Sequence, residues 1–233
     1  MSKLLYIETA TKVCSVALSE KGKLIAFRES LHAYSHAELL TTFMEESIKE
    51  VSWNYDNLDA IVVSKGPGSY TGLRIGVSSA KGLCFSLEKP LIAVSTLQAM
   101  AFGMAKLIGA TDEKVLFCPM IDARRMEVYS AIFDKENNEM RKIEAEIIDE
   151  NSFSDYLKDH IVYFAGDGAE KCKESFSNQA NARFLDDFQI SSKDMIEIAT
   201  QKFEKKLFED VAYFEPYYLK DFVAGPPRVK GLK

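Results

Sequence analysis

Two short stretches carry residues whose types and spacing could bind phosphate. The first, Lys65–Gly72 (KGPGSYTG), lies between a strand pattern and a helix pattern. Backbone N–H groups at a helix start attract anions, which makes this stretch a candidate phosphate loop. A Walker loop, however, ends in Gly-Lys-Ser/Thr, which is missing here, and Pro67 has no N–H to donate. The sequence therefore favours a tight structural turn over a phosphate cradle.

The second stretch, Glu8–Thr11 (ETAT), lies at an expected hairpin. The corresponding hairpin of actin-like ATPases binds phosphate, and a carboxylate there holds the metal ion. Thr9 and Thr11 are on this basis candidate nucleotide-binding residues. The other interpretation is a hairpin whose threonine hydroxyls satisfy its own turn. If the hairpin binds nucleotide, the chain is an actin-like small-molecule kinase or ATPase, and we keep this as an alternative functional hypothesis.

A third polar stretch, Asp122–Glu127 (DARRME), separates two expected strands and places Arg124 beside Arg125. Adjacent guanidinium groups could bind phosphate or the carboxylates of a partner. The simpler interpretation is a loop whose arginines are solvated or paired within the chain.

Two histidines, His32 and His36, are four residues apart, a spacing found in metal-binding helices. The sequence Ser35–Glu38 fits the capping box Ser-x-x-Glu, which puts Ser35 at the N-cap and His32 outside the helix. The two imidazoles then do not share a face, and the remaining histidine is His160. We expect no metal site, and no Ser-His-Asp or Cys-His catalytic group stands out.

Composition and charge narrow the functional classes. The chain has 233 residues, 47% of them hydrophobic and 27% charged, as in globular proteins. Its net charge of −6 argues against a stand-alone RNA binder, which usually carries a basic face. No apolar run approaches the roughly 18 residues of a membrane span, and Glu8 comes too early for a signal peptide. We expect a cytoplasmic protein without membrane contact.

The cysteines support the same location. They form no Cys-x-x-Cys pair, which argues against a zinc knuckle and indicates reduced thiols. They are Cys14, Cys84, Cys118 and Cys172.

The elements that must position these residues follow from hydrophobic periodicity. In the first half the pattern predicts three strands, then helices and strands in alternation. The strands are expected at Leu4–Ala10, Val13–Glu20, Lys23–Ser30, Leu58–Lys65 and Pro90–Ser95, and the helices from Ser35, over Tyr70–Leu87 and from Ser95 to about Ile108. The second capping box, Ser95–Gln98, opens the last of these helices.

A similar order begins again at Val115. The expected strands are Val115–Asp122, Glu127–Asp134, Arg141–Asp149 and Ile161–Ala165, and the expected helices are Ser154–Asp159, Ala169–Ser177 and Ser192–Glu209. Two copies of a three-strand meander followed by alternating helices and strands predict an α/β protein with a two-domain actin-like (ASKHA, ribonuclease-H-like) fold. Each domain is then βββαβα-like with a mixed sheet.

The domain limits are expected at 1–108 for the first domain, which carries the partner-binding helices, and at 109–210 for the second. The remaining segment, 211–233, contains three prolines and is not expected to form one helix. We expect it to pack back on the first domain and to end in a mobile tail.

Small residues recur on the expected helix Tyr70–Leu87. Gly72, Gly76 and Ala80 lie at i, i+4 and i+8, and helix glycines cost roughly 1 kcal/mol each against alanine. Close packing within the chain would offset this cost. A helix-on-helix interface with a partner, using this strip and the apolar ridge of the preceding helix, would do so equally well.

Several of these stretches together resemble the TsaB (YeaZ) family. The match is dense over residues 1–98 and comes in islands beyond. The matching pieces are Ile7–Ala10, Ser35–Leu40, Gly66–Gly76, Ala80–Leu83, Ile121–Arg125, Gly166–Gly168 and Pro216–Leu219.

The resemblance implies a non-catalytic subunit required for threonylcarbamoylation of adenosine 37 in tRNA. Such a subunit pairs with and activates the transferase subunit TsaD, with the small ATPase TsaE as third partner. ATP and metal are then expected in the partner subunits, no cofactor in this chain, and tRNA contact through the complex. The same surface could form a homodimer when the partner is absent.

The resemblance also separates this chain from the catalytic paralogue. Catalytic relatives carry a metal-binding His-x-x-x-His after the strand equivalent to Pro90–Val94, and Thr96 and Met100 stand at those positions here. Threonine lacks the nitrogen donor and methionine is a soft thioether, so neither replaces imidazole. Glu8 stands where many members have aspartate, which supports the absence of ATPase activity. A metallopeptidase, a role once attached to the catalytic paralogue, is a third hypothesis.

The family interface uses the two helices of the first domain. Carried onto this chain, it comprises His36, Leu39, Leu40, Phe43, Met44, Tyr70, Gly72, Leu73, Gly76, Val77 and Ala80. From the sequence we expect Gly76→Arg or Ala80→Arg to abolish pairing and to leave the monomer folded.

Overall fold

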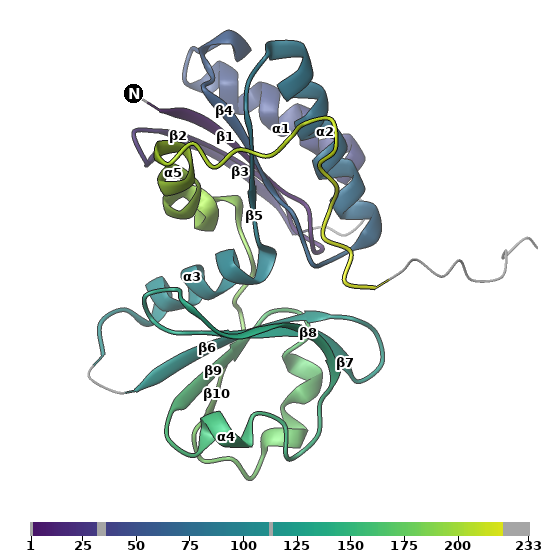
Figure 1. Ribbon diagram of the computed structural model, residues 1–233, viewed down its shortest axis with the longest axis vertical. Helices are drawn as coiled ribbons and strands as arrows, with labels where there is room; N and C mark the ends of the chain where they lie inside the picture. The colour runs from purple at the N-terminus through teal and green to yellow at the C-terminus, as the bar shows by residue number, and fades with distance from the viewer. Residues whose placement is uncertain (1, 32–35, 112–113, 221–233) are drawn as a thin grey trace, which may run out of the picture.

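The first of two five-stranded sheets lies within the N-terminal half of the chain (Figure 1). The computed structural model describes residues 2–31, 36–111 and 114–220. The strands of this sheet lie in the order β3-β2-β1-β4-β5. Their bounds are β1 (Lys3–Glu8), β2 (Cys14–Glu20), β3 (Lys23–Ser30), β4 (Ala60–Ser64) and β5 (Leu91–Val94).

The second sheet repeats this arrangement in the order β8-β7-β6-β9-β10. Its strands are β6 (Val115–Asp122), β7 (Glu127–Phe133), β8 (Glu139–Ile147), β9 (Ile161–Ala165) and β10 (Ala182–Leu185). In both sheets the first three strands are antiparallel and the other two continue in parallel. This repeat confirms the two-domain actin-like α/β fold with a mixed sheet in each half.

Helices α1 (His36–Glu50) and α2 (Tyr70–Leu87) cover one face of the first sheet (Figure 1). Side chains of a strand alternate between faces, so Leu5 and Ile7 of β1 enter the core beneath these helices. A short 3-10 helix, η1 (Tyr55–Asn57), precedes β4.

The opposite face of the first sheet shares one apolar core with the second sheet. Helix α5 (Ile196–Glu204) packs on this face, and helix α3 (Thr96–Ile108) packs on β6 and β7 of the second sheet. Tyr6 of β1, Met100 of α3 and Phe117 of β6 belong to the same buried cluster and are at most 1% exposed. The two halves are therefore joined by side-chain packing as well as by the linking chain.

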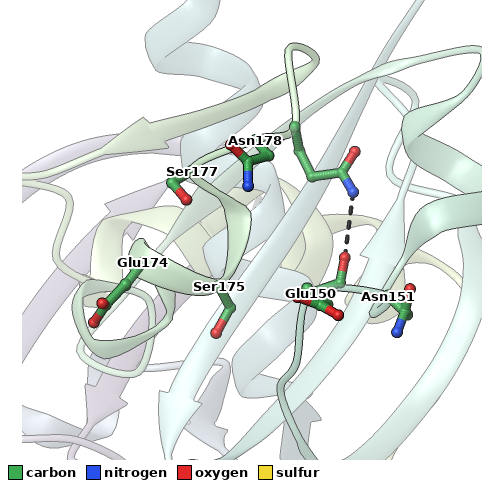
Figure 2. Close-up of a pocket in the computed structure, with 7 residues that line it drawn as sticks. Glu150, Asn151, Glu174, Ser175, Ser177 and Asn178 are labelled. Carbon is green, nitrogen blue, oxygen red and sulfur yellow. Dashed lines mark hydrogen bonds between the residues drawn. The ribbon is translucent and has the colours of Figure 1, made fainter.

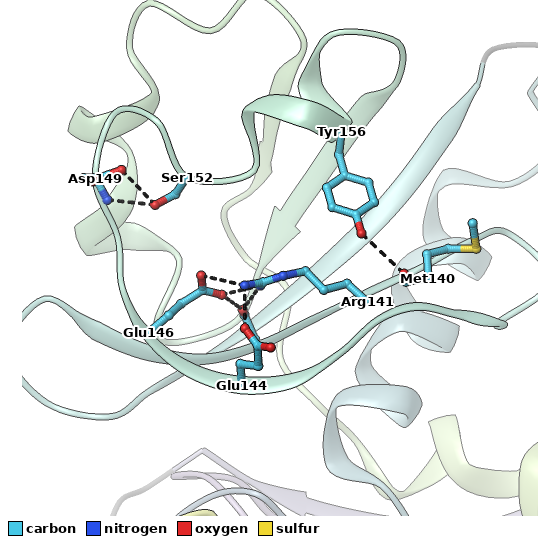
Figure 3. A network of polar contacts seen from close by, with 8 residues as sticks. Met140, Arg141, Glu144, Glu146, Asp149, Ser152 and Tyr156 are labelled. Carbon is cyan, nitrogen blue, oxygen red and sulfur yellow. Dashed lines mark hydrogen bonds and ion pairs between the residues drawn. The ribbon is translucent and has the colours of Figure 1, made fainter.

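The far face of the second sheet is covered by short helices: α4 (Ser154–Leu157), η2 (Glu170–Cys172) and η3 (Glu174–Phe176). At its edge strand β8, Arg141 forms ion pairs with Glu144 (2.7 Å) and Glu146 (2.5 Å), as Figure 3 shows. The Arg141 guanidinium also lies 5.0 Å from the ring centre of Phe153. Charged side chains on an exposed edge discourage pairing with a further strand.

Two predicted helices differ from the observed ones. The predicted helix Ala169–Ser177 is wrong, because this segment forms the two 3-10 helices η2 and η3. Ala169, Cys172 and Phe176 are buried at intervals of three and four residues, and an α-helix would bury residues at the same intervals. The predicted helix Ser192–Glu209 begins as the 3-10 helix η4 (Ser192–Met195) and ends at Glu204 of α5. Lys206 has a left-handed φ of 55°, which ends the helix.

Two further predictions concern helix starts and chain limits. Ser95 is the N-cap of α3 and accepts a hydrogen bond from Gln98 N at 3.5 Å, whereas Ser35 lies outside the described residues. The chain returns to the first sheet earlier than position 210, because Ser192 N donates to Ser15 Oγ at 2.8 Å. The domain limits themselves stay a prediction.

The last described residues, 209–220, form an extended segment that we call the C-terminal strap (yellow in Figure 1). Glu209 N donates to Leu91 O at 2.9 Å, and Tyr217 N donates to Lys65 O at 2.7 Å. Between them, Lys81 Nζ donates to the carbonyls of Ala212 (3.2 Å) and Phe214 (2.8 Å). The strap therefore lies against α2. The expected mobile tail falls on 221–233, outside the described residues.

All four cysteines are free and buried. Burial raises the pKa of the Cys14 and Cys172 thiols to about 11 and that of Cys84 to about 12, and it raises the pKa of Cys118 as well. Within the described ranges, none of the helices has the length and apolar character needed to cross a membrane.

Candidate partner interface

The small-residue strip of α2 faces the first sheet. A Cβ atom on Gly76 would lie 2.3 Å from Thr9 Oγ1, and one on Gly72 would lie 2.1 Å from Thr9 O. Ala80 is fully buried. Close packing within the chain thus accounts for these three residues, and Leu73 and Val77 are buried on the same side.

This placement corrects one expectation drawn from the sequence. An arginine at position 76 or 80 would enter the packing between α2 and β1, so Gly76→Arg and Ala80→Arg are expected to unfold the protein. They cannot test pairing with a partner. The partner contacts predicted at these buried positions stay a prediction.

The face of α2 that points away from the sheet was missed by the sequence analysis. It carries Thr71, Arg74, Ser78 and Gly82, all exposed, and Phe85, whose side chain is 84% exposed. Among the described residues, a Cβ atom on Gly82 would meet nothing within 4 Å. Small residues spaced three and four apart could have indicated this face from the sequence. The opposite face of α2 carries small residues at the same spacing, so the pattern does not distinguish the two faces.

The predicted residues of α1 divide into buried and half-buried positions. Leu40 and Met44 are buried in the core beneath the helix, whereas Leu39 and Phe43 are half-buried at its margin. His36 is buried and its Nε2–H donates to the carbonyls of Thr11 (3.0 Å) and Val13 (3.1 Å), which fixes the helix start on the first hairpin. Its role is thus that of a satisfied core histidine rather than a metal ligand.

Tyr70, also predicted at the interface, lies at the first turn of α2 next to the strap. Its ring centre is 4.8 Å from that of Tyr218, and the guanidinium of Arg74 lies 5.7 Å from it. The strap therefore forms one border of the exposed face of α2.

The first hairpin uses its polar groups within the chain. Thr9 is buried, and its Oγ1 donates to Gly72 O at 2.8 Å. Thr11 Oγ1 accepts a hydrogen bond from Val13 N at 3.3 Å. The threonines of this hairpin thus satisfy local backbone groups, and nucleotide binding at Thr9 and Thr11 stays a prediction.

Glu8 is fully buried at the end of β1. Its Oε1 accepts a hydrogen bond from Ala10 N at 2.6 Å, while Oε2 has no partner among the described residues. Burial raises the pKa of Glu8 to about 7; the negative charge of Asp194 acts in the same direction, and hydrogen bonds to the carboxylate oppose it. Burial of an ionised carboxylate costs free energy, so Glu8 holds its proton more readily than an exposed carboxyl does.

The glycine-rich loop before α2 is a tight turn with a cis Gly66–Pro67 bond. Gly66 N donates to Thr96 Oγ1 at 3.0 Å, and Ser69 N donates to Ala10 O at 2.6 Å. A Cβ atom on Gly68 would lie 2.3 Å from the same Ala10 carbonyl, so glycine is required there. The N–H groups of Gly66 and Ser69 thus bond within the chain, in agreement with the structural turn that the sequence favours.

The two positions that correspond to the metal ligands of catalytic relatives are part of the core. Thr96 is fully buried and its Oγ1 lies 2.7 Å from Ser64 Oγ. Met100 is 1% exposed and packs near Gly166. In the parts of the chain described here, no group of three or more histidine, cysteine or acidic side chains is arranged to hold a metal ion.

The loop between β6 and β7, which we call the arginine hairpin (residues 122–127), holds Arg124 and Arg125 in left-handed backbone conformations with φ of 74° and 52°. Such conformations cost non-glycine residues about 1–3 kcal/mol each. Both side chains are exposed. The hairpin is thus an unusual local structure at the surface.

A polar depression of about 480 Å³ lies on the second half of the molecule (Figure 2). Its lining residues come from the segments before α4 and after β9; they are Glu150, Asn151, Glu174, Ser175, Ser177, Asn178 and Gln179. None of them belongs to the residues predicted from the sequence to bind a partner or a nucleotide.

Comparison with known proteins places this arrangement in a family. The family model described as TsaD, tRNA N6-adenosine threonylcarbamoyltransferase, matches residues 30–227. The Escherichia coli protein TsaB, a tRNA threonylcarbamoyladenosine biosynthesis protein, is 32% identical over 95% of this chain and 96% of its own length. Bacillus subtilis TsaB is 32% identical over 70% of each chain.

Solved structures agree on the fold. A Pseudomonas aeruginosa protein described as similar to peptidase YeaZ superimposes with a TM-score of 0.80 at 23% identity, over 94% of this chain and all of that one. YeaZ from the same organism gives a TM-score of 0.75 over the same shares of the two chains. From its sequence relatives and its fold, the chain belongs to the TsaB (YeaZ) family of tRNA threonylcarbamoyladenosine biosynthesis proteins.

Proposed function

We propose that this chain is a non-catalytic subunit that pairs with the transferase subunit TsaD and activates it for threonylcarbamoylation of adenosine 37 in tRNA, with TsaE as third partner. The family assignment supports the pathway. The burial of Thr96 and Met100 within the core supports the non-catalytic role, because neither side chain reaches a surface where it could hold a metal ion. The protein acts in the cytoplasm and binds no cofactor of its own.

The observation that carries the pairing is the exposed face of α2. Gly82 lies in the helix interior, where glycine costs about 1 kcal/mol against alanine, and a Cβ atom added to it would meet nothing within 4 Å among the described residues. Phe85 is 84% exposed one turn further on. Because Gly82 has no side chain, a second helix could approach α2 closely there, and that helix would cover the exposed ring of Phe85.

The occupant we propose is a helix pair of the transferase subunit. A Koribacter versatilis tRNA N6-adenosine threonylcarbamoyltransferase is 38% identical over 68 residues, which are 29% of this chain and 18% of the transferase. Related helices in the two subunits would pair about a pseudo-twofold axis. A homodimer formed through the same face in the absence of the partner follows from the same geometry.

The function is tested by incorporation of labelled threonine into unmodified tRNA. The mixture contains the threonylcarbamoyl-adenylate synthase, TsaD and TsaE, with or without this protein. We expect incorporation only when the protein is present. Equal incorporation without it, with an active control TsaB, would contradict the proposed function.

The interface is tested by Gly82→Arg, a change that the open surroundings of Gly82 allow without unfolding. We expect at least a tenfold loss of affinity for TsaD in a pull-down or calorimetric titration. The matched control is Gln201→Arg on the exposed side of α5, which adds the same charge to another helix. Unchanged pairing by folded Gly82→Arg protein would remove the interface from this face.

A further inference from the structure

Arg124 and Arg125 are cations without an ion-pair partner among the residues that the structure describes. Both side chains are exposed, and neither forms an ion pair or a side-chain hydrogen bond with the described residues. Their left-handed φ angles of 74° and 52° fix them at the turn of the arginine hairpin. The proposed pairing through α2 does not use them.

The hairpin is held by its neighbours rather than by these arginines. Arg124 N donates to Asp122 Oδ1 at 3.0 Å, and Asp122 N donates to Asp167 Oδ1 at 2.9 Å. Lys171 forms an ion pair with Asp122, and its Nζ donates to Glu127 O at 2.7 Å. The carboxylates at the hairpin thus serve its backbone and its lysine, so the guanidinium groups remain available.

Further cations surround the two arginines. Lys12, on the loop between β1 and β2, is close enough to Asp167 to lower the pKa of that carboxyl against the rise caused by burial. Lys220, at the end of the strap, pairs with Glu127. Around the hairpin, cations outnumber carboxylates, although the whole chain carries a net charge of −6.

We propose that Arg124 and Arg125 bind the phosphate backbone of the RNA on which the family acts. A guanidinium group presents two parallel N–H donors to a phosphate, and phosphate contacts position an RNA without reading its sequence. The left-handed backbone conformations hold both residues at the exposed turn of the hairpin. This inference rests on the proposed function for the identity of the RNA, and it adds a contact made by this chain itself.

RNA is favoured over an acidic protein because the arginines lie among lysine and carboxylate side chains, which are depleted at the centre of protein interfaces. The arginine hairpin instead gathers charged groups. Two apolar side chains are also exposed here: Met126 of the hairpin is 40% exposed, and Ile147 is 73% exposed beside it, since Ile148 N donates to Met126 O at 3.2 Å. Ile147→Ser therefore distinguishes the two occupants: RNA binding should not need this side chain, whereas a protein partner would.

The test is fluorescence anisotropy of labelled, unmodified tRNA, titrated with the full chain alone and in complex with TsaD over a range of salt concentrations. For Arg124→Ala/Arg125→Ala we expect weaker binding and a plot of log K against log salt whose slope falls by about one to two, because each phosphate contact contributes about 0.7–0.9. Arg124→Lys/Arg125→Lys should restore most of the slope, since the charge is kept.

The matched control is Lys205→Ala/Lys206→Ala. These adjacent lysines are also exposed, and Lys206 also has a left-handed φ, of 55°. We expect the control to bind tRNA as the wild type does. The proposal is overturned if the arginine variant keeps the wild-type slope, if both double variants lose binding equally, or if the wild-type chain shows no salt-dependent binding in either form.

Two more outcomes are decisive. If Ile147→Ser and the arginine variant weaken pairing with TsaD and leave tRNA binding unchanged, the hairpin binds an acidic protein and the proposal is overturned. If the wild type binds tRNA through the hairpin but gives no threonine incorporation, the proposed function fails while this contact stands.

Discussion

We expect the carboxyl of Glu8, at the end of β1, to make the stability of the protein depend on pH. It is fully buried, and burial raises its pKa from the usual 4.5 to about 7. The native protein therefore holds a proton here that the unfolded chain releases at a lower pH. Between pH 4.5 and 7 the native state binds more protons, so stability falls as the pH rises through this window.

Glu8→Gln should remove this dependence. The amide has the same shape, can still accept from Ala10 N and carries no charge at any pH. We expect the variant to be more stable than the wild type above pH 7, by up to roughly 3 kcal/mol, and to lose the advantage below pH 5. Urea unfolding at several pH values measures this. An equal pH dependence in both proteins would show that Glu8 is not the titrating group.

The carboxyl of Asp194 also makes the stability of the native state fall as the pH rises, so it serves as a comparison for Glu8 within the same protein. Burial raises its pKa to about 6, and it also caps η4 by accepting from Ser191 N at 3.1 Å. In Glu8→Gln protein, the pH dependence that remains should therefore be centred at a lower pH than in the wild type.

We expect replacement by alanine to have opposite effects on stability at two glycines of α2, Gly76 and Gly82. Gly76→Ala would place a Cβ atom 2.3 Å from Thr9 Oγ1, which already donates to Gly72 O, so we expect a loss of about 1–3 kcal/mol. Gly82→Ala meets nothing within 4 Å and should gain about 1 kcal/mol from helix propensity. Thermal unfolding by circular dichroism of both variants tests the orientation of α2. Equal losses would mean that Gly82 is also packed.

At the scale of elements, the sequence predicts α2 with the bounds observed, Tyr70–Leu87. It does not predict which side of α2 faces the sheet, because small residues line both sides and Thr9 contacts the helix from far along the chain. The turn before α2 was predictable from the missing Walker signature. The sequence left open whether Arg124 and Arg125 are solvated or paired within the chain, since the choice depends on Lys171 and Asp167, which lie after β9 and bind Asp122.

Local ambiguity explains the remaining differences. The four-residue strand β10 was missed because its pairing with β9 is long-range and its own pattern is short. The 3-10 helices η2 and η3 bury the same residues as an α-helix would. Tertiary contacts decide between such alternatives, and a single sequence does not contain them.

The C-terminal strap depends on one lysine. Lys81 Nζ donates to the carbonyls of Ala212 and Phe214, and Phe214 packs against the core beneath α2. We expect Lys81→Met to cost about 1 kcal/mol and to speed cleavage within 209–220 by a low concentration of protease. Lys142→Met, at an exposed lysine without a described ion pair, is the control. Cleavage at the wild-type rate would show that the strap is held without Lys81.

At the scale of the whole molecule, the shared core predicts that the two sheets unfold together. Phe117 of β6 and Tyr6 of β1 belong to one buried cluster. Phe117→Ala should therefore destabilise both halves, by about 3–5 kcal/mol. The single tryptophan, Trp53, lies in the first half and reports on it by fluorescence.

The measurement compares the midpoint of Trp53 fluorescence with that of far-ultraviolet circular dichroism in denaturant. Coincident midpoints, both lowered in Phe117→Ala, are expected for one cooperative transition. A fluorescence midpoint that stays at the wild-type value would mean that the first sheet is stable on its own.

The burial of all four cysteines has a practical consequence. Thiolates are the reactive form, and these thiols are both enclosed and reluctant to ionise. A cysteine introduced at an exposed position away from α2, such as Lys142, would be the preferred site for a maleimide dye, with no need to remove the native ones. Assembly with other subunits could then be followed by energy transfer from a single, chosen point on an otherwise unaltered protein.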